Sequence, residues 1–277
     1  MAVPPYEMPE WQRRYQDLEA FRRVRNAERD YGRRLRQLAR NIENMVRSYV
    51  EGHHDETEIQ QVLGGYTAPH DLAGLASMLD RYSAILDPWA QSVALRFVVE
   101  VARRDQAAWA TYAKTMSRAL QQEIQTAPTG ELLQRALAEQ VSLIKSIPEQ
   151  AAKRVHEIAV GNLYGGERYG DLIKVIMDQG QVSRNKATLI ARTETARVSS
   201  LLTQTRATHV GGTHYIWSTV RDARVRESHR KMNGQTIAWD APPSPDGPGV
   251  GPYHAGQIWN CRCFAIPIIP DRYPIAA

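Results

Sequence analysis

Two cysteines separated by one residue, Cys261 and Cys263, are the side chains of this sequence best suited to hold a metal ion. On an extended backbone, residues two apart point to the same face, so both sulfurs are expected side by side. Two thiolates supply half of the tetrahedral ligand set that zinc prefers, and two upstream imidazoles are candidates for the other half. The pattern predicts a structural zinc site with the ligands His229, His254, Cys261 and Cys263.

Two further interpretations of this region stay open. Asp222 is a reserve ligand, because in a helix it would lie about two turns before His229 and share its face. The cysteines can also be explained without a metal, as two reduced side chains packed like small apolar residues. A catalytic metal has less support, because no His-Glu-x-x-His or His-x-Glu pattern supplies a general base beside these ligands.

The segment that carries these residues has the composition of a small mixed domain. Long loops and a length of roughly 65 residues give such a domain a thin core, which a metal often reinforces. Tyr215 and Trp217 share one face of the first predicted strand and are expected in the core. The expected elements are a strand over 214–220, a short helix over 225–232, an Asn-Gly turn at 233–234, a Pro- and Gly-rich loop over 241–252 and a closing strand or pair of strands within 258–269.

The preceding three quarters of the chain have helical periodicity. The expected helices cover 31–49, 71–125 with a break near Pro88, 131–158 with a kink or restart at Pro148, 171–177 and 184–209, where Gly211-Gly212 ends the last one. The first helix has a narrow apolar stripe with alternating steps of four and three, which suits a partner helix in the same chain or in another copy. Its members are Tyr31, Leu35, Leu38, Ile42, Met45 and Tyr49.

These patterns predict an α+β fold, with a mostly helical N-terminal body and a small β-containing C-terminal domain that zinc would staple. The expected division is a helical region over 1–127, a second helical part over 128–210 and the small α+β domain over 211–277. No apolar window reaches the roughly 18 residues of a membrane span, and the N-terminus has no secretory pattern, so we expect no membrane partner and folding in a reducing cytoplasm.

The net charge of +5 is concentrated in the arginine-rich residues 11–49. This stretch offers a possible contact with DNA or with an acidic protein surface. Acidic residues interleave with the arginines, which is also typical of a solvated helix face. Both interpretations stay open for the N-terminal region.

Several short motifs occur in a fixed order between about residues 141 and 269. They are Leu143-Ile144-Lys145-Ser146-Ile147-Pro148, Ala191-Arg192-Thr193-Glu194, Trp217 with Thr219, Asp222-Ala223-Arg224-Val225-Arg226, His229, Gly234, His254 and Asn260-Cys261-Arg262-Cys263. In this order and spacing the sequence resembles the Mu F-like family of minor head proteins of tailed bacteriophages.

The resemblance implies a structural role in head assembly and in genome packaging or delivery, without catalysis. It implies the portal, major capsid and scaffold proteins as partners, and a place in the virion head interior after assembly in the host cytoplasm. Related domains also occur fused to toxins, in which the fused partner carries the activity. The alternatives from the residues themselves are a metal-dependent nuclease that uses Asp222 and His229, or a virion protein that binds DNA through its arginine-rich helix.

At the candidate site the sequence departs from the family pattern. Many relatives have a Cys-x-x-Cys pair after the aspartate and a histidine closer to the Cys-Arg-Cys motif. Here Arg226 and His229 stand at the two cysteine positions, and His254 lies farther upstream. An imidazole at His229 keeps a ligand type that zinc accepts, whereas Arg226 does not, so the ligand set must differ from that of the relatives.

Overall fold

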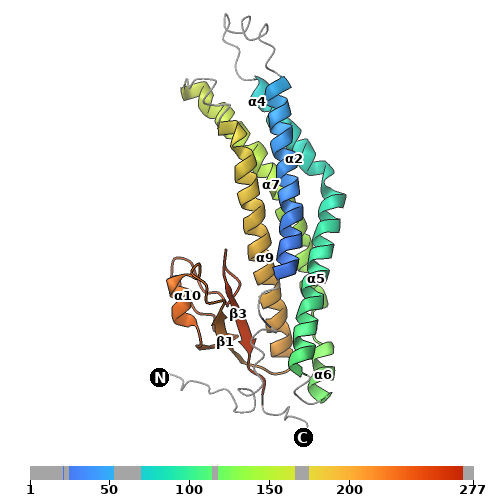
Figure 1. Ribbon diagram of the computed structural model, residues 1–277, viewed down its shortest axis with the longest axis vertical. Coiled ribbons are helices and arrows are strands. Elements are labelled where there is room, and N and C mark those ends of the chain that lie inside the picture. Colours follow the sequence, from blue (N-terminus) through green and yellow to red (C-terminus); the bar gives the residue numbers. More distant parts are fainter. Residues whose placement is uncertain (1–20, 22–24, 53–69, 114–117, 166–174, 271–277) are drawn as a thin grey trace, which may run out of the picture. The chain divides into compact units, whose positions relative to one another are not determined.

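The computed structural model of this chain describes residues 21, 25–52, 70–113, 118–165 and 175–270 (Figure 1). Its elements are helices α2 (Arg25–Gly52), α4 (His70–Ile85), α5 (Asp87–Ala113), α6 (Arg118–Gln125), α7 (Gly130–Gly165), α9 (Gln179–His209) and α10 (Glu227–Met232), and strands β1 (His214–Thr219), β2 (Thr236–Ala238) and β3 (Cys263–Pro267). The predicted α+β fold is confirmed. No helix within these ranges is both long and apolar enough to cross a bilayer.

The chain packs into two compact units, each built from stretches that are not consecutive in sequence. Of the described residues, the helical unit comprises 29–52, 70–95, 138–165 and 175–191, and the sheet unit comprises 21, 25–28, 96–113, 118–137 and 192–270. The boundaries fall inside α2, α5, α7 and α9. The three-part division expected from the sequence concerns consecutive segments and stays a prediction.

In the helical unit, the apolar stripe of α2 packs against other helices of the same chain. Tyr31 donates a hydrogen bond from its hydroxyl to Gln140 on α7 at 3.0 Å, and Arg184 on α9 pairs with Glu43 at 2.9 Å. The stripe therefore serves the intramolecular packing that the sequence left open. The arginine-rich face of α2 is partly neutralised within the helix, where one carboxylate, Asp30, pairs with the two arginines that follow it.

The end of the stripe differs from the prediction. Val46 is buried, whereas Met45 and Tyr49 are half-buried. The predicted steps average 3.5 residues per turn, but an unconstrained helix has about 3.6, so the buried line drifts by one position after three turns. A buried line that drifts in this way is expected of a straight helix, whereas a strict seven-residue repeat would require a supercoil.

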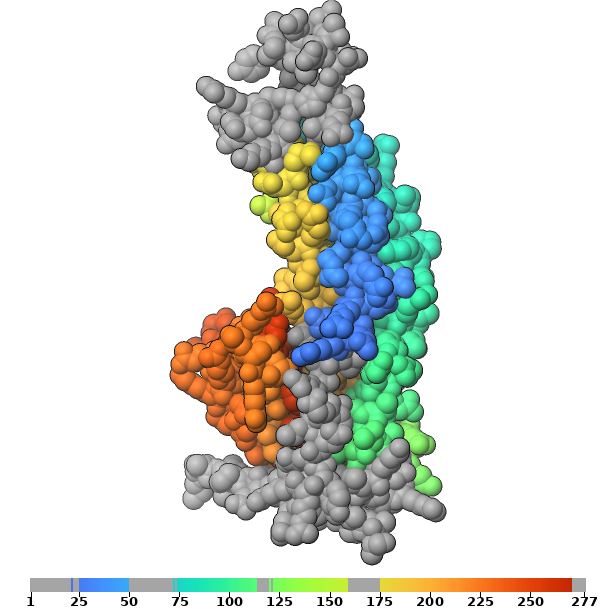
Figure 2. Space-filling model, in the orientation of Figure 1, coloured from blue at the N-terminus to red at the C-terminus, as the bar shows by residue number. Residues whose placement is uncertain are grey.

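The sheet unit contains a three-stranded antiparallel sheet in the order β2-β1-β3, with α10 beside it (Figure 1). Tyr215 and Trp217 on β1 are fully buried, as predicted, and the Tyr215 ring stacks on Trp239 with centroids 4.2 Å apart. The strand β2 was not predicted, because its three residues are all half-buried and show no alternation. Figure 2 shows these C-terminal residues, orange to red, forming one continuous body.

A glycine allows β3 to approach the end of α9. A Cβ atom on Gly212 would lie 2.8 Å from the carbonyl oxygen of Ile268 and 2.9 Å from that of Ala207. Gly211 has a positive φ of 82°, which ends the helix as the sequence predicted. The chain therefore turns directly from α9 into the sheet.

A buried ion pair fixes α5 to α9 within the sheet unit. Arg206 donates to Asp105 at 2.7 Å and to the carbonyl oxygen of Ile124 at 2.8 Å, while Thr203 donates to the same carboxylate at 3.2 Å. Burial raises the pKa of Asp105 to about 6, because the loss of solvation outweighs the attraction of the guanidinium. Nearby, the Tyr112 hydroxyl donates to the carbonyl oxygen of Pro267 and ties α5 to β3.

Candidate metal centre

Three of the four predicted ligands come together in the sheet unit. The Nδ1 atom of His229, on α10, lies 3.6 Å from Sγ of Cys261 and 3.4 Å from Sγ of Cys263. One ligand atom from each residue lies within 4.8 Å of the other two, and all three side chains are buried. One imidazole nitrogen and two sulfurs at these separations form a compact set of soft and borderline donors that can bind a metal ion. His229, Cys261 and Cys263 are called the metal group below.

The turn before β3 brings the two sulfurs together. Cys261 donates its backbone N–H to Ile258, and the backbone N–H of Cys263 points back to the Cys261 sulfur at 3.4 Å. Asn260 adopts a positive φ of 56°, which asparagine tolerates better than most residues, and its N–H donates to Thr193 on α9 at 3.1 Å. The predicted same-face placement of the sulfurs is therefore reached through a turn that enters the strand rather than through a continuous strand.

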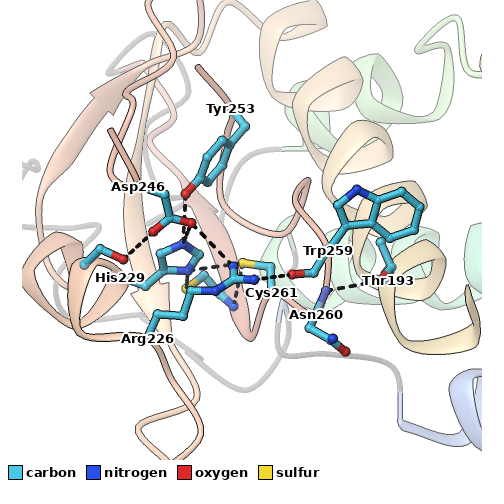
Figure 3. A network of polar contacts seen from close by, with 10 residues as sticks. Thr193, Arg226, His229, Asp246, Tyr253, Trp259, Asn260 and Cys261 are labelled. Atoms are coloured by element: carbon cyan, nitrogen blue, oxygen red, sulfur yellow. Dashed lines mark hydrogen bonds and ion pairs between the residues drawn. The ribbon is translucent and has the colours of Figure 1, made fainter. Parts of the chain in front are cut away.

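The other nitrogen of His229 faces oxygen atoms. Nε2 lies 3.0 Å from the Tyr253 hydroxyl and 3.5 Å from a carboxylate oxygen of Asp246, whose other oxygen accepts a hydrogen bond from Ser228 (Figure 3). With Nε2 protonated and directed at these oxygens, Nδ1 presents its lone pair to the sulfurs. A carboxylate behind a ligating imidazole is a recurrent feature of zinc sites, because it fixes the tautomer and the ring orientation.

The two thiols do not titrate alike. The Cys263 thiol donates a hydrogen bond to the Cys261 sulfur, and this hydrogen bond lowers the pKa of Cys261. The same hydrogen bond and burial raise the pKa of Cys263. The pair thus holds one thiolate readily, whereas a second thiolate requires a nearby cation.

The surroundings of Cys263 also suit a metal-bound thiolate. The buried indole N–H of Trp217 has no hydrogen-bond partner within the described part of the chain. This N–H lowers the pKa of the Cys263 thiol, although the hydrogen bond to Cys261 and burial raise that pKa more. A donor of this kind beside the sulfur, together with a free imidazole lone pair and two thiols, means that the residues present fit a zinc ion.

His254, the fourth predicted ligand, is not part of this group. Its ring is buried, and Nδ1 lies 3.3 Å from the hydroxyl of Tyr215. Burial lowers the pKa of His254 and favours the neutral imidazole. Its role in the structure is to satisfy a buried tyrosine hydroxyl, so the ligand set supported by the geometry has three protein residues.

Asp222, the reserve ligand, also lies outside the group. It precedes α10 in a turn, so the helical spacing to His229 does not apply. One carboxylate oxygen accepts the backbone N–H of Arg224, and the other pairs with Arg262. In this structure the Asp222 carboxylate is thus occupied by Arg262 and by the turn that precedes α10.

Sequence reasoning missed Asp246 and Tyr253. Both come from the Pro- and Gly-rich loop, which has no periodicity from which their positions could be inferred. Their closeness to His229 depends on how this loop folds back over α10. Asp246 is the one charged residue in the loop over 241–252, and this isolated carboxylate was the signal in the sequence that could have identified it.

Residues 153–266 match the family described as Phage Mu protein F like protein. The matched range contains α9, β1, β2, α10, β3 up to Ile266 and all three residues of the metal group. The match confirms the resemblance inferred from the motifs, and residues 153–266, which are similar to this family, are called the Mu F-like region below.

Curated relatives cover a similar stretch. An uncharacterized protein of Haemophilus influenzae is 34% identical over 135 residues, which is 49% of this chain and 29% of that protein. Minor head protein GP7 of Bacillus phage SPP1 is 30% identical over 161 residues, which is 53% of this chain and 52% of that protein. The NAD(+)–arginine ADP-ribosyltransferase EFV of Enterococcus faecalis is 26% identical over 134 residues, 46% of this chain and 28% of that protein.

This chain therefore spans about half or less of the length of these relatives. No solved structure matches it significantly. Most of the transferase lies outside its match, as expected when a shared region is fused to different partners.

Proposed function

We propose that this protein is a minor head protein of a tailed bacteriophage that acts structurally in head assembly and in genome packaging or delivery. The observation that carries the proposal is the Mu F-like region at residues 153–266, together with 30% identity to a phage minor head protein over half of its length. The proposed partners are the portal protein first, and then the major capsid and scaffold proteins. The proposed location is the head interior, after assembly in the host cytoplasm.

The structure gives the proposal a physical basis. The Mu F-like region includes a long helix, α9, whose buried Arg206 binds Asp105 on α5 and the carbonyl oxygen of Ile124 at the end of α6. The sheet is attached to the same helix through the Asn260–Thr193 contact. Such connected, buried polar contacts favour a rigid body that presents its loops in a fixed arrangement.

The nuclease alternative loses its geometric basis. It required Asp222 and His229 to act on one metal ion, but the Asp222 carboxylate is held by Arg262 and by a backbone N–H, and His229 is buried. Contact between DNA and α2 is disfavoured where Asp30 neutralises Arg33 and Arg34, while residues 11–20 and 22–24 lie outside the described chain. We therefore keep the structural role as the proposed function.

Co-expression with the portal protein tests this role. A tagged portal protein of the same phage is purified after co-expression with the untagged full chain, and the eluate is examined by size exclusion and native mass spectrometry. We expect a stable complex of the two proteins that survives physiological salt. A portal that elutes alone under these conditions, at protein concentrations well above micromolar, would overturn the proposed partnership.

We further propose that His229, Cys261 and Cys263 bind a structural zinc ion. When bound, the ion would supply a cation that stabilises both thiolates and links α10 to the start of β3. The three side chains are buried, which favours a structural role over an open catalytic position.

Metal analysis tests the zinc proposal without any activity assay. Protein purified without added metal should contain about one zinc per chain, and Cys263→Ser should lose it and melt at a lower temperature. The matched control is His254→Gln, another buried histidine of the same unit, which should keep the metal. Zinc-free wild-type protein with unchanged melting in Cys263→Ser would leave the two cysteines as packing residues only.

A further inference from the structure

Trp259 is an exposed aromatic side chain beside the metal group. Its exposure is 54%, and the other tryptophans in the described part of the chain are buried or half-buried. In Figure 3 its indole points away from the His229 imidazole, although Trp259 is only two residues from Cys261. With more than half of its surface in water, the indole adds little to the core, so folding alone gives a weak reason for a tryptophan at this position.

Two exposed arginines lie on the segment that runs beside Trp259. The segments 220–226 and 259–262 are joined by the Val220 N–H to the Arg262 carbonyl at 3.1 Å and by Arg226 to the Trp259 carbonyl at 2.8 Å. Arg221 and Arg224 are exposed, and their side chains form no ion pair with any described residue. The nearest acid in sequence, Asp222, is already paired with Arg262, so these two positive charges are not neutralised locally.

Both segments are held rigidly. Arg221 and Asn260 each have a φ of 56°, and they are the two residues other than glycine with positive φ among those the structure describes. Such conformations persist only when surrounding contacts enforce them, and they concentrate at binding sites. Here Asn260 is fixed on both sides, by Thr193 at 3.1 Å and by Arg192 at 3.3 Å. A side chain presented on a fixed loop loses little conformational entropy when a partner binds.

We infer that Trp259 with Arg221 and Arg224, hereafter the Trp259 surface, docks on another head protein whose surface has an apolar pocket with an acidic rim. The inference rests on the proposed function and names the surface through which the chain would contact its partner. Tryptophan and arginine are the residues most enriched at the energetic centres of protein interfaces. Two unpaired arginines complement an acidic rim, and the indole fills the pocket.

The number of free charges favours a protein partner over a nucleic acid. Proteins that track a phosphate backbone commonly neutralise several phosphates, roughly six to ten in well-studied cases. In the loop pair, Arg226 lies 3.6 Å from Asp246, and Arg262 pairs with Asp222, which leaves Arg221 and Arg224. A single aromatic anchor with two unpaired cations on the adjoining segment is a small footprint that suits a pocket on a protein.

The test measures binding of the purified full chain to immobilised portal protein. Trp259→Ala should weaken the affinity by about 30-fold or more, as expected for an interface anchor. The double variant Arg221→Glu/Arg224→Glu should weaken it by about tenfold or more, because two attractions become repulsions. The matched control is Arg81→Glu/Arg96→Glu, at two exposed arginines that have no ion pair in the described chain, and it should change the affinity less than about threefold.

The possible results separate the inference from the proposed function. If wild-type protein does not bind portal, the proposed partnership fails, and the Trp259 surface fails with it as a portal-docking site. If wild type binds and Trp259→Ala binds equally well with unchanged circular dichroism and metal content, only the Trp259 surface is overturned. A labelled single-stranded oligonucleotide is the second probe, and loss of its binding in Trp259→Ala with portal binding unchanged would make the partner a nucleic acid and refute the inference.

Discussion

Replacing Arg206 by methionine gives a pH-dependent loss of stability whose size follows from the buried pair. Arg206 and Asp105 have side-chain exposures of 7% and 2%, so the carboxylate cannot gain solvation when its partner is removed. Methionine keeps most of the apolar volume of the arginine stem. Removing one partner of a buried pair costs about 3–5 kcal/mol at neutral pH, because the remaining carboxyl group must either stay charged in the interior without compensation or take up a proton.

Part of this cost should disappear in acid. In the wild type the folded-state pKa of Asp105 is raised from 3.8 to about 6, so its stabilising contribution is complete below 3.8 and is lost as the pH rises through 6. Without Arg206 the folded-state pKa rises further, and the variant keeps a proton on Asp105 at pH 7.5 that the wild type has released. Each pH unit above 6 then lowers the free energy of unfolding of the variant by about 1.4 kcal/mol relative to wild type. Between pH 5.5 and 7.5 only the range above 6 contributes, so the difference amounts to about 2 kcal/mol.

Urea unfolding at pH 5.5 and 7.5, followed by tryptophan fluorescence, measures both the total loss of stability and the share of it that depends on pH. Trp109 is a buried reporter in the same unit. We expect Arg206→Met to lose about 2 kcal/mol more at the higher pH, and the double variant Asp105→Asn/Arg206→Met to show no such difference. At pH 7.5 the melting temperature should fall by about 10 °C. An equal loss at the two pH values would refute the account of desolvation at Asp105.

Three further substitutions test other contacts. Asp246→Asn should weaken zinc retention by about 10–100-fold in a chelator competition, because the carboxylate orients His229; retention equal to wild type would remove Asp246 from the metal site. Gly212→Ala should cost about 1–3 kcal/mol in urea unfolding, since its Cβ would lie within 2.9 Å of two backbone carbonyl oxygens; an unchanged midpoint would contradict that crowding. Tyr31→Phe should cost about 1 kcal/mol through loss of its hydrogen bond to Gln140, and equal stability would show that the bond contributes nothing.

The elements that could be predicted from sequence are those set by local chemistry. The glycine pair that ends α9 was predicted because left-handed backbone favours glycine, and Gly211 has φ 82°. The β1 strand was predicted from alternating aromatic and β-branched residues, and Tyr215 and Trp217 are buried as expected. The strand β2 was missed, since three half-buried residues carry no alternation and their pairing is set by β1.

The same division holds at the metal group. Cys261 and Cys263 were predicted because a spacing of two places both sulfurs together, and His229 because an imidazole suits them. His254 was proposed as a ligand on residue type alone. The fold of the loop before it places its ring beside Tyr215 instead of the two sulfurs. Asp246 was missed for the same reason, because no periodic pattern in a Pro- and Gly-rich loop shows which side chain folds back onto α10.

Quantitative mass spectrometry of purified mature phage particles tests the proposed role as a minor head protein. We expect this polypeptide in DNA-filled heads at a fixed low copy number relative to portal subunits, and fewer infectious particles when its gene is silenced. Particles that lack the polypeptide, and that assemble and infect normally without it, would contradict the assignment as a minor head protein.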